Sequence, residues 1–346
     1  MASEKIVVML PGQAAQEAGM GEEAFDTYDE VKEVFYTAST IAGEDLAEYC
    51  WGSKTDELKG AIVQPALGAA ILADLAVKKK NGLVPSLYMG HSVSEIIALS
   101  AAGAFPDLND TFRILTVRGL AMDDANLKNP GVMTAFLGPN RENFDWALNL
   151  VNRRLSRIGE SAIYHGMANW TEQHVASGNV AGIQVMENVF DVIHRVGGVA
   201  RARARLIKDD GAAHTPHMES AVERVYEEIR RAKKREPDVP VLANDGRYLD
   251  DPSRYAYYLS HQLIMPADWQ LSMWVAVEEG YRDFVEVGTK KELMTTFAKR
   301  EFKEHRIVRE KFGDVVHIVR VSEASPSIRE QLKLLAARQI TSLQTG

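Results

Sequence analysis

A serine between a short apolar stretch and a helical stretch offers the first chemistry in this chain. Ser92 lies within Gly90-His91-Ser92-Val93-Ser94, which follows the G-x-S-x-G pattern of a nucleophile elbow except that serine replaces the last glycine. Such a turn lifts a hydroxyl out of a sheet, next to backbone amides that favour anions. The hydroxyl needs a base within hydrogen-bond distance, and nine histidines could supply it. A helix N-cap would use the same serine, so the pattern alone leaves catalysis open.

Several other chemistries find no support in the sequence. No G-x-G-x-x-G loop follows a strand, and the G-x-x-x-x-G-K-[ST] and H-E-x-x-H motifs do not occur. Cys50 is the only cysteine, which excludes an internal disulfide and Cys-rich metal sites and fits a reducing compartment. No base lies near it in the sequence, which argues against a thiol nucleophile. We therefore expect neither a metal nor a resident cofactor.

Short buried strands alternating with helices would position Ser92. The β-branched run at residues 6–10 ends at Pro11-Gly12, as a strand buried on both faces would. Apolar spacing predicts further strands at 86–89, 239–243 and 284–287, and helices at 31–42, 64–80 and 93–102. This alternation predicts an α/β fold with a parallel sheet.

The middle of the chain has a different pattern. Strand-like stretches at 132–136, 161–168, 174–176 and 199–205 are interrupted by helical stretches at 143–154 and 185–196. Gly197-Gly198 would end the second helix. The order β-α-β-β-α-β predicts a small ferredoxin-like α+β domain at residues 128–205, inserted into a larger domain made of 1–127 and 206–346. Beyond Asp314 we expect another strand and then a helix that begins at a Ser327/Glu330 capping box.

Composition excludes several classes of protein. Apolar residues make up 46% and charged residues 25% of the 346, as in soluble globular proteins rather than disordered ones. The net charge of −8 provides no global basic field for nucleic acid. The apolar stretch 67–77 is broken by Asp74 and is shorter than the roughly 20 residues that span a bilayer. The apolar run before Pro11 is too short for a secretory signal. We expect a cytoplasmic protein with no membrane or nucleic-acid partner.

Several short blocks of residues occur in a specific order between residue 6 and about residue 300. They read Pro11-Gly12-Gln13-Ala14-Ala15-Gln16, Gln64-Pro65-Ala66-Leu67, Gly90-His91-Ser92-Val93-Ser94-Glu95, Arg118-Gly119 with Met122, Asn169 with Gln173, His214-Thr215-Pro216-His217-Met218, Gln262-Leu263 with Pro266 and Trp269, and Glu286-Val287-Gly288. Together they resemble the malonyl-CoA:acyl carrier protein transacylases and the related acyltransferase domains of polyketide synthases, including the discrete, trans-acting type. The resemblance implies an α/β-hydrolase-like large domain with a ferredoxin-like small domain.

The resemblance also implies catalytic roles for particular residues. Ser92 would be the nucleophile and His214 the base that takes its proton. A backbone carbonyl of Gln262 would orient the histidine, so that no third acid is needed. The backbone N–H groups of Val93 and Gln13 would form the oxyanion hole.

Arg118 would hold the free carboxylate of a malonyl-type acyl group, for which the planar guanidinium fork is suited. A surface arginine on a helix is the alternative reading. Gln64, Asn169 and Ala213 would line the pocket, although the two amides could equally satisfy nearby backbone groups.

The chain departs from the family's pattern at three places. Ser94 replaces the glycine that usually lets the elbow helix pack closely on its neighbouring strand, and Ala14 replaces a glycine beside Gln13. Ala212-Ala213 precedes His214 where malonyl-selective domains tend to carry a bulkier phenylalanine. Small residues there could widen the pocket for a substituted malonyl unit, whereas the apolar Val93 is more typical of malonyl enzymes.

The expected function is acyl transfer in fatty acid or polyketide biosynthesis. A malonyl-type group would pass from malonyl-CoA or a related acyl-CoA to Ser92, and then to the phosphopantetheine thiol of an acyl carrier protein. Two alternatives remain: an acyl hydrolase of the same fold and a catalytically silent carrier-binding module. Carrier proteins are generally acidic, so a local basic face is expected, with candidates Arg201, Arg203, Arg205, Lys208 and the run at 230–235.

Overall fold

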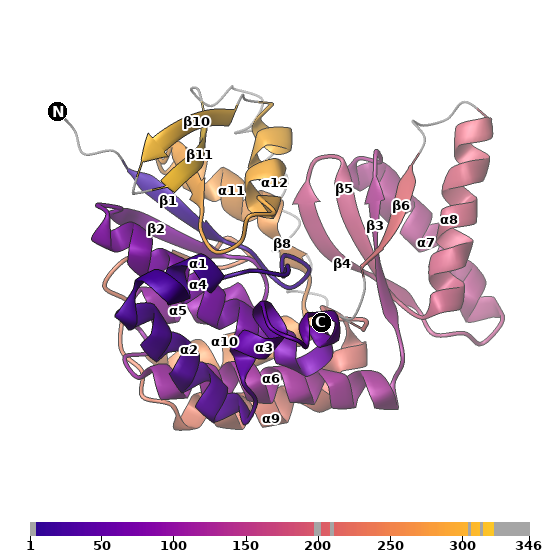
Figure 1. Cartoon of the computed structure of the whole chain (residues 1–346). Helices are drawn as coiled ribbons and strands as arrows, with labels where there is room; N and C mark the ends of the chain where they lie inside the picture. Colours follow the sequence, from indigo (N-terminus) through magenta and orange to yellow (C-terminus); the bar gives the residue numbers. More distant parts are fainter. Residues whose placement is uncertain (1–4, 197–201, 208–210, 304–305, 312–313, 322–346) are drawn as a thin grey trace.

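A mostly parallel six-stranded sheet forms the centre of the larger lobe in the computed structural model, which describes residues 5–196, 202–207, 211–303, 306–311 and 314–321 (Figure 1). The strand order is β10-β11-β9-β1-β2-β7. The four strands β9, β1, β2 and β7 pair in parallel, and a β10–β11 hairpin adds an antiparallel edge. The strands are β1 (Ile6–Leu10), β2 (Pro85–Gly90), β7 (Val241–Leu242), β9 (Asp283–Glu286), β10 (Arg306–Lys311) and β11 (Asp314–Arg320).

Helices cover both faces of this sheet, as the continuous apolar run of β1 predicts. Ile6, Val8 and Leu10 pack into a core on one face, whereas Val7 and Met9 pack into a second core on the other. The helices on the first side are α1 (Glu22–Thr27), α2 (Asp29–Ala42), α3 (Leu46–Cys50), α4 (Val63–Lys80), α5 (Ser94–Ala101), α6 (Leu108–Lys128), α9 (Glu219–Arg231) and α10 (Tyr255–His261). Those on the second side are α11 (Trp269–Glu278) and α12 (Leu293–Phe302).

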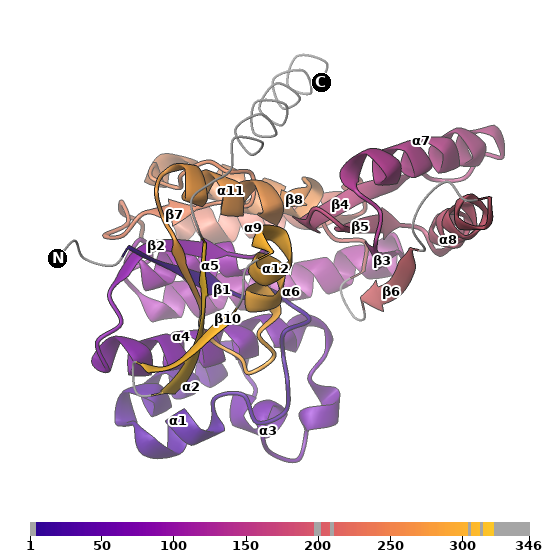
Figure 2. The ribbon, with the colours of Figure 1, turned by 90° about the horizontal axis from the view of Figure 1, so that it is seen from above.

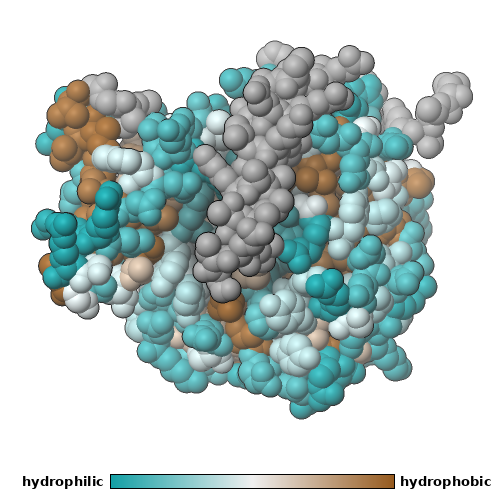
Figure 3. All heavy atoms as spheres, turned by 180° about the vertical axis from the view of Figure 1, so that it is seen from behind, coloured by the Kyte–Doolittle hydropathy of each residue, from teal (hydrophilic) through white to brown (hydrophobic). Residues whose placement is uncertain are grey.

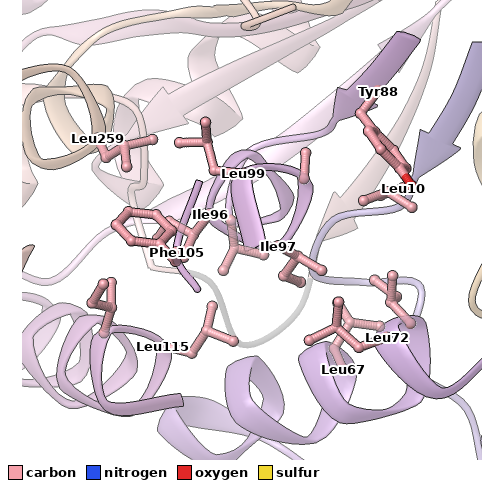
Figure 4. Close-up of a cluster of buried hydrophobic side chains, with 14 of the residues drawn as sticks. Leu10, Leu67, Leu72, Tyr88, Ile96, Ile97, Leu99, Phe105, Leu115 and Leu259 are labelled. Carbon is pink, nitrogen blue, oxygen red and sulfur yellow. The ribbon is translucent and has the colours of Figure 1, made fainter. Parts of the chain in front are cut away.

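The first core surrounds the helix that follows the elbow turn. Ile96 and Ile97 of α5 face the side chains of Leu115 and Leu67 from the neighbouring helices, and Leu99 lies on the opposite side of α5, toward Leu259 (Figure 4). This packing fixes the beginning of α5, and therefore the turn before it, relative to the sheet.

Among the described residues, one stretch, Gly60–Lys80, is long and apolar enough by length and composition to cross a membrane, and 67% of its apolar window is buried inside the molecule. That burial is typical of a core helix. From behind, most of the visible surface is hydrophilic, with the hydrophobic residues in separate groups (Figure 3).

A second sheet forms the smaller lobe, which projects to one side of the larger one (Figure 2). Its order is β6-β3-β5-β4-β8, with β3 (Val132–Leu137), β4 (Ile163–Trp170), β5 (Gln173–Gly178), β6 (Arg203–Ile207) and β8 (Ala267–Asp268). The helices α7 (Arg141–Arg157) and α8 (Val180–Arg195) cover one face, where a third core includes Phe136, Phe144, Val151 and Phe190.

The predicted β-α-β-β-α-β order of this lobe is confirmed by β3 to β6. The sequence did not predict β8, which comes from residues 267–268 and pairs in parallel with β4, nor β10. Both were missed because a two-residue strand carries no periodicity and β10 is rich in charged residues. The glycine pair at 197–198 and the predicted helix after Ser327 lie outside the described residues.

Candidate active site

Ser92 lies on the tight turn between β2 and α5. Its backbone φ is 53°, a left-handed conformation that costs energy in a residue other than glycine and recurs at functional sites. A side chain at Gly90 would overlap the Ser94 carbonyl, so glycine is needed where the chain doubles back. The predicted elbow is therefore present.

His214 completes a dyad with this serine. The Ser92 Oγ and His214 Nε2 are 2.8 Å apart, and Nδ1 lies 3.0 Å from the backbone oxygens of both Gln262 and Met265. Because carbonyl oxygens only accept hydrogen bonds, Nδ1 must carry the proton, which leaves the Nε2 lone pair for the serine hydroxyl. Burial, reinforced by the charge of Arg118, lowers the pKa of His214 to about 3, so the base is neutral at physiological pH.

Arg118 is buried beside the dyad rather than exposed on its helix α6, with 1% of its surface accessible. Its Nη1 donates to Gln64 Oε1 at 2.9 Å, and its Nη2 donates to Gln262 Oε1 at 3.1 Å. Two amide oxygens thus accept hydrogen bonds from the guanidinium and orient it. This placement contradicts the alternative of a surface arginine.

Gln262 makes side-chain hydrogen bonds in addition to the backbone contact with His214 that was expected of its carbonyl. Its Nε2 donates to the Ser92 carbonyl at 2.8 Å and also contacts the Glu95 carboxyl, while its Oε1 accepts from Arg118. One residue therefore contacts His214 through its backbone, and the nucleophile and the arginine through its side chain. Burial raises the pKa of Glu95 to about 8 although backbone and side-chain N–H groups donate to it.

Asn244 is a site residue that the sequence analysis did not identify. Its Oδ1 accepts from the Ser92 N–H at 2.7 Å, and its Nδ2 donates to the Gly90 carbonyl at 2.6 Å. Its own backbone N–H donates to Glu95 Oε1 at 2.6 Å. The available signal was its position directly after the predicted strand 239–243, at the carboxyl edge of the parallel sheet where sites gather.

The proposed oxyanion donors come from two loops that touch. Gln13 follows β1, and Val93 follows the nucleophile after the neighbouring strand β2. A side chain at residue 12 would come within 2.7 Å of the His91 carbonyl. Glycine at this position therefore lets the two loops lie in contact. Next to Gln13, Ala14 has a φ of 81°, which a glycine would adopt without strain.

Asn169 reaches the site from the second sheet. Its Oδ1 lies 3.0 Å from His91 Nε2, and its Nδ2 donates to Gln173 Oε1 at 2.8 Å. The His91 ring also packs against Trp269 and Phe297. The small lobe thereby contacts the residue beside the nucleophile.

The two alanines before His214 are closely packed. Ala213 is buried and its carbonyl accepts from Ser177 Oγ at 2.8 Å. A side chain at Gly131 would lie 2.5 Å from the Ala212 methyl, and Ala212 is fully buried. The Ala212 methyl therefore lies close to the backbone at Gly131.

A small polar cavity lies beside Gln64. Its volume is about 10 Å³, roughly enough for one water molecule. The lining residues are Gln13, Gly60, Gln64, Met122, Asp123, Asn126 and Gly211. In the described parts of the chain, no cluster of three or more His, Cys, Asp or Glu side chains could hold a metal ion.

Comparison with known proteins shows the family to which this chain is similar. The acyl transferase domain matches residues 7–312. The chain is 28% identical to the malonyl CoA-acyl carrier protein transacylase of Bacillus subtilis over 291 residues, which cover 84% of this chain and 88% of that protein. The solved structure of the malonyl CoA-acyl carrier protein transacylase from Coxiella burnetii has a TM-score of 0.79 and 25% identity, covering 88% of this chain and 93% of that one.

A further solved structure contains a type II PKS acyl-carrier protein in complex with its malonyl-transacylase. It has a TM-score of 0.78 and 25% identity, and covers 87% of this chain and 94% of that one. The match to the domain extends over most of the chain, from β1 to the hairpin at the edge of the large sheet. The chain therefore belongs to the acyl transferase domain family.

Proposed function

We propose that this protein transfers a malonyl-type acyl group from CoA to the phosphopantetheine thiol of an acyl carrier protein, through an acyl group held on Ser92. The observation that carries the proposal is the Ser92–His214 dyad, with the buried Arg118 joined to it through the Gln262 side chain. The names of the relatives and of the solved structures support the same substrate and partner.

The first half-reaction forms the acyl-enzyme. Ser92 Oγ attacks the thioester carbonyl while its proton moves to His214 Nε2, and the N–H groups of Val93 and Gln13 donate to the oxygen that becomes negatively charged. The carbon–sulfur bond then breaks, and the imidazolium returns the proton to the CoA thiolate. The second half-reaction reverses these roles, with the phosphopantetheine thiol as nucleophile and Ser92 as leaving group.

Arg118 selects the acyl group by its charge. A malonyl carboxylate that reaches the guanidinium forms charge-assisted hydrogen bonds, whereas an acetyl group has nothing to place there. Gln64 holds the guanidinium, and Asn169 and Ala213 complete the pocket walls. We place malonyl first among the acyl units because the apolar Val93 after the serine is more typical of malonyl enzymes.

The remaining expectations belong to the same proposal. The acyl-CoA is a substrate and the phosphopantetheine is carried by the partner, so the enzyme needs no metal or cofactor of its own. We also propose a cytoplasmic location, no nucleic-acid or membrane partner, and a division into a catalytic domain of residues 1–127 and 206–346 and a small domain of residues 128–205. The carrier would serve either fatty acid or polyketide synthesis.

Intact-protein mass spectrometry tests the proposal. Wild type and Ser92→Ala are incubated briefly with malonyl-, methylmalonyl- and acetyl-CoA, with and without a phosphopantetheinylated carrier protein. We expect a malonyl adduct on wild type only, which passes to the carrier. Free malonate without carrier loading would instead identify a hydrolase, a dominant methylmalonyl adduct would identify a substituted unit, and no adduct or turnover would contradict enzymatic function.

A further inference from the structure

A buried hydroxyl joins the two segments that carry the proposed oxyanion donors. Ser94 is fully buried at the start of α5, and its Oγ donates to the Pro11 carbonyl at 2.5 Å. Ser94 comes one residue after Val93, and Pro11 comes two residues before Gln13. The hydrogen bond therefore links the nucleophile turn to the donor loop within two residues of each donor.

Other contacts hold the donor loop without fixing its distance from α5. The Lys291 ammonium donates to the Ala14 carbonyl at 3.2 Å and also contacts the Gln16 carbonyl. Gln64 Nε2 donates to the Gln13 side chain at 3.3 Å. On the elbow side, the His91 N–H donates to the Leu10 carbonyl at 2.9 Å, which continues the pairing of β1 with β2 up to the beginning of the loop.

We infer that Ser94 is a positioning residue that sets the separation of the Val93 and Gln13 N–H groups. This inference rests on the function proposed above. Its hydroxyl joins the two segments at the position where glycine would leave only backbone contact. Without it, the buried Pro11 carbonyl loses this donor and the loop can move to find another partner. A displaced donor stabilises the oxyanion less, because that stabilisation depends on donors already placed for the transition state.

The inference predicts a specific kinetic signature. Ser94→Ala keeps the Cβ and removes only the hydroxyl, and Ser94→Gly restores the glycine expected for the family. Both should slow the acylation of Ser92 by malonyl-CoA about tenfold in single-turnover experiments, while KM changes by less than about twofold. Binding is spared because neither variant touches Arg118.

Thr111→Val provides the matched control. Thr111 is a buried residue of α6 whose hydroxyl donates at 2.9 Å to Ser100, at the opposite end of α5. Its loss should lower the melting temperature about as much as Ser94→Ala does, with acylation unchanged. A purely structural role for Ser94 would instead give the two variants the same kinetics.

The labelling of Ser92 by a fluorophosphonate separates failure of this inference from failure of the proposed function, because the phosphonyl oxygen occupies the same hole whatever the natural substrate. We expect Ser94→Ala to slow labelling about as much as acylation. Labelling of wild type without any reaction with an acyl-CoA would contradict the proposed function and still test Ser94. Unchanged labelling and acylation in Ser94→Ala, faster reaction in Ser94→Gly, or no labelling of wild type would overturn the inference.

Discussion

The two lobes each bury a histidine, and only one of the two faces a serine hydroxyl. His214 in the large lobe and His174 in the small lobe are almost wholly inaccessible, and burial lowers the pKa of each to about 3. Burial and a lowered pKa therefore do not identify the catalytic residue. The difference lies in the partners of the ring nitrogens.

His174 has both ring nitrogens engaged by its own lobe. Its Nε2 lies 3.2 Å from the Thr171 carbonyl, to which it must donate, so the lone pair is on Nδ1, which faces His165 Nε2 at 3.2 Å. The His165 Nδ1 lies 3.0 Å from an Asp145 carboxylate oxygen, and Phe144 packs against both rings. Both ring nitrogens of His174 therefore face groups of its own lobe, and neither faces a serine hydroxyl.

His214 has the opposite arrangement. Two carbonyls accept from Nδ1, and the remaining nitrogen faces a serine held in a left-handed conformation. His214 therefore differs from His174 in the serine hydroxyl that faces its free nitrogen, whereas burial keeps both rings neutral.

The largest expected effect is a difference in acylation rate between variants of the two histidines. His214→Gln is expected to slow the acylation of Ser92 by about 10³-fold, because the hydroxyl loses its proton acceptor. His174→Gln should leave acylation unchanged while lowering the melting temperature. Single-turnover acylation and thermal unfolding of both variants measure this, and a comparable rate loss in both would break the distinction.

Arg118→Ala should reduce malonyl loading about 100-fold relative to acetyl loading. Only the malonyl group would place a carboxylate in the site with no charged partner. The ratio of kcat/KM for the two acyl-CoA donors measures the effect. Equal losses for both donors would mean that the arginine supports the fold around Gln262 rather than the substrate.

Asn244→Ala should slow acylation about tenfold, because the turn at Ser92 loses the bridge between its N–H and the Gly90 carbonyl. Asn152→Ala is the control from the small lobe. Its amide bridges the N–H and carbonyl of Ile163 in the same way, at 2.9 and 2.8 Å. The control variant should be less stable and have an unchanged acylation rate. An equal loss of rate in the two variants would refute a role specific to the turn at Ser92.

The last prediction concerns the pH dependence of stability rather than a rate. The pKa of His174 is lower in the folded protein, at about 3, than its ordinary value of 6.5, so the unfolded chain binds more protons between those values. Its contribution to the free energy of unfolding is complete above pH 6.5 and is lost as the pH falls, by up to about 1.4 kcal/mol per pH unit.

Urea unfolding from pH 7 to pH 4 tests that contribution. The stability difference between wild type and His174→Gln should shrink as the pH is lowered. A difference that is constant over this range would mean that His174 does not stay neutral in the folded state.

The sequence predicted those features that short patterns encode. The β1 run and the turn at Ser92 are local, and the apolar spacing around them predicts a layered α/β fold. The identities of His214 and Arg118 came from blocks of residues in order, since nothing in the spacing alone selects one histidine among nine.

Such short patterns do not predict the tertiary contacts of the site. Asn244 reaches Ser92 from 152 positions away in the sequence, and the Gln262 side chain from 170. Their roles depend on which strand ends and loops lie side by side in the folded chain. The same holds for Ser94, whose substitution for glycine was visible, although its Pro11 partner was not.

Locating the acyl group on the chain tests the acyl-enzyme most directly. Wild-type protein is quenched after brief exposure to malonyl-CoA, digested and fragmented in a mass spectrometer, and a parallel sample is chased with phosphopantetheinylated carrier protein before quenching. We predict malonyl on Ser92 alone, and its loss in step with an equal gain of malonyl by the carrier. A malonyl group on any other residue, or its loss without a gain by the carrier, would contradict the mechanism.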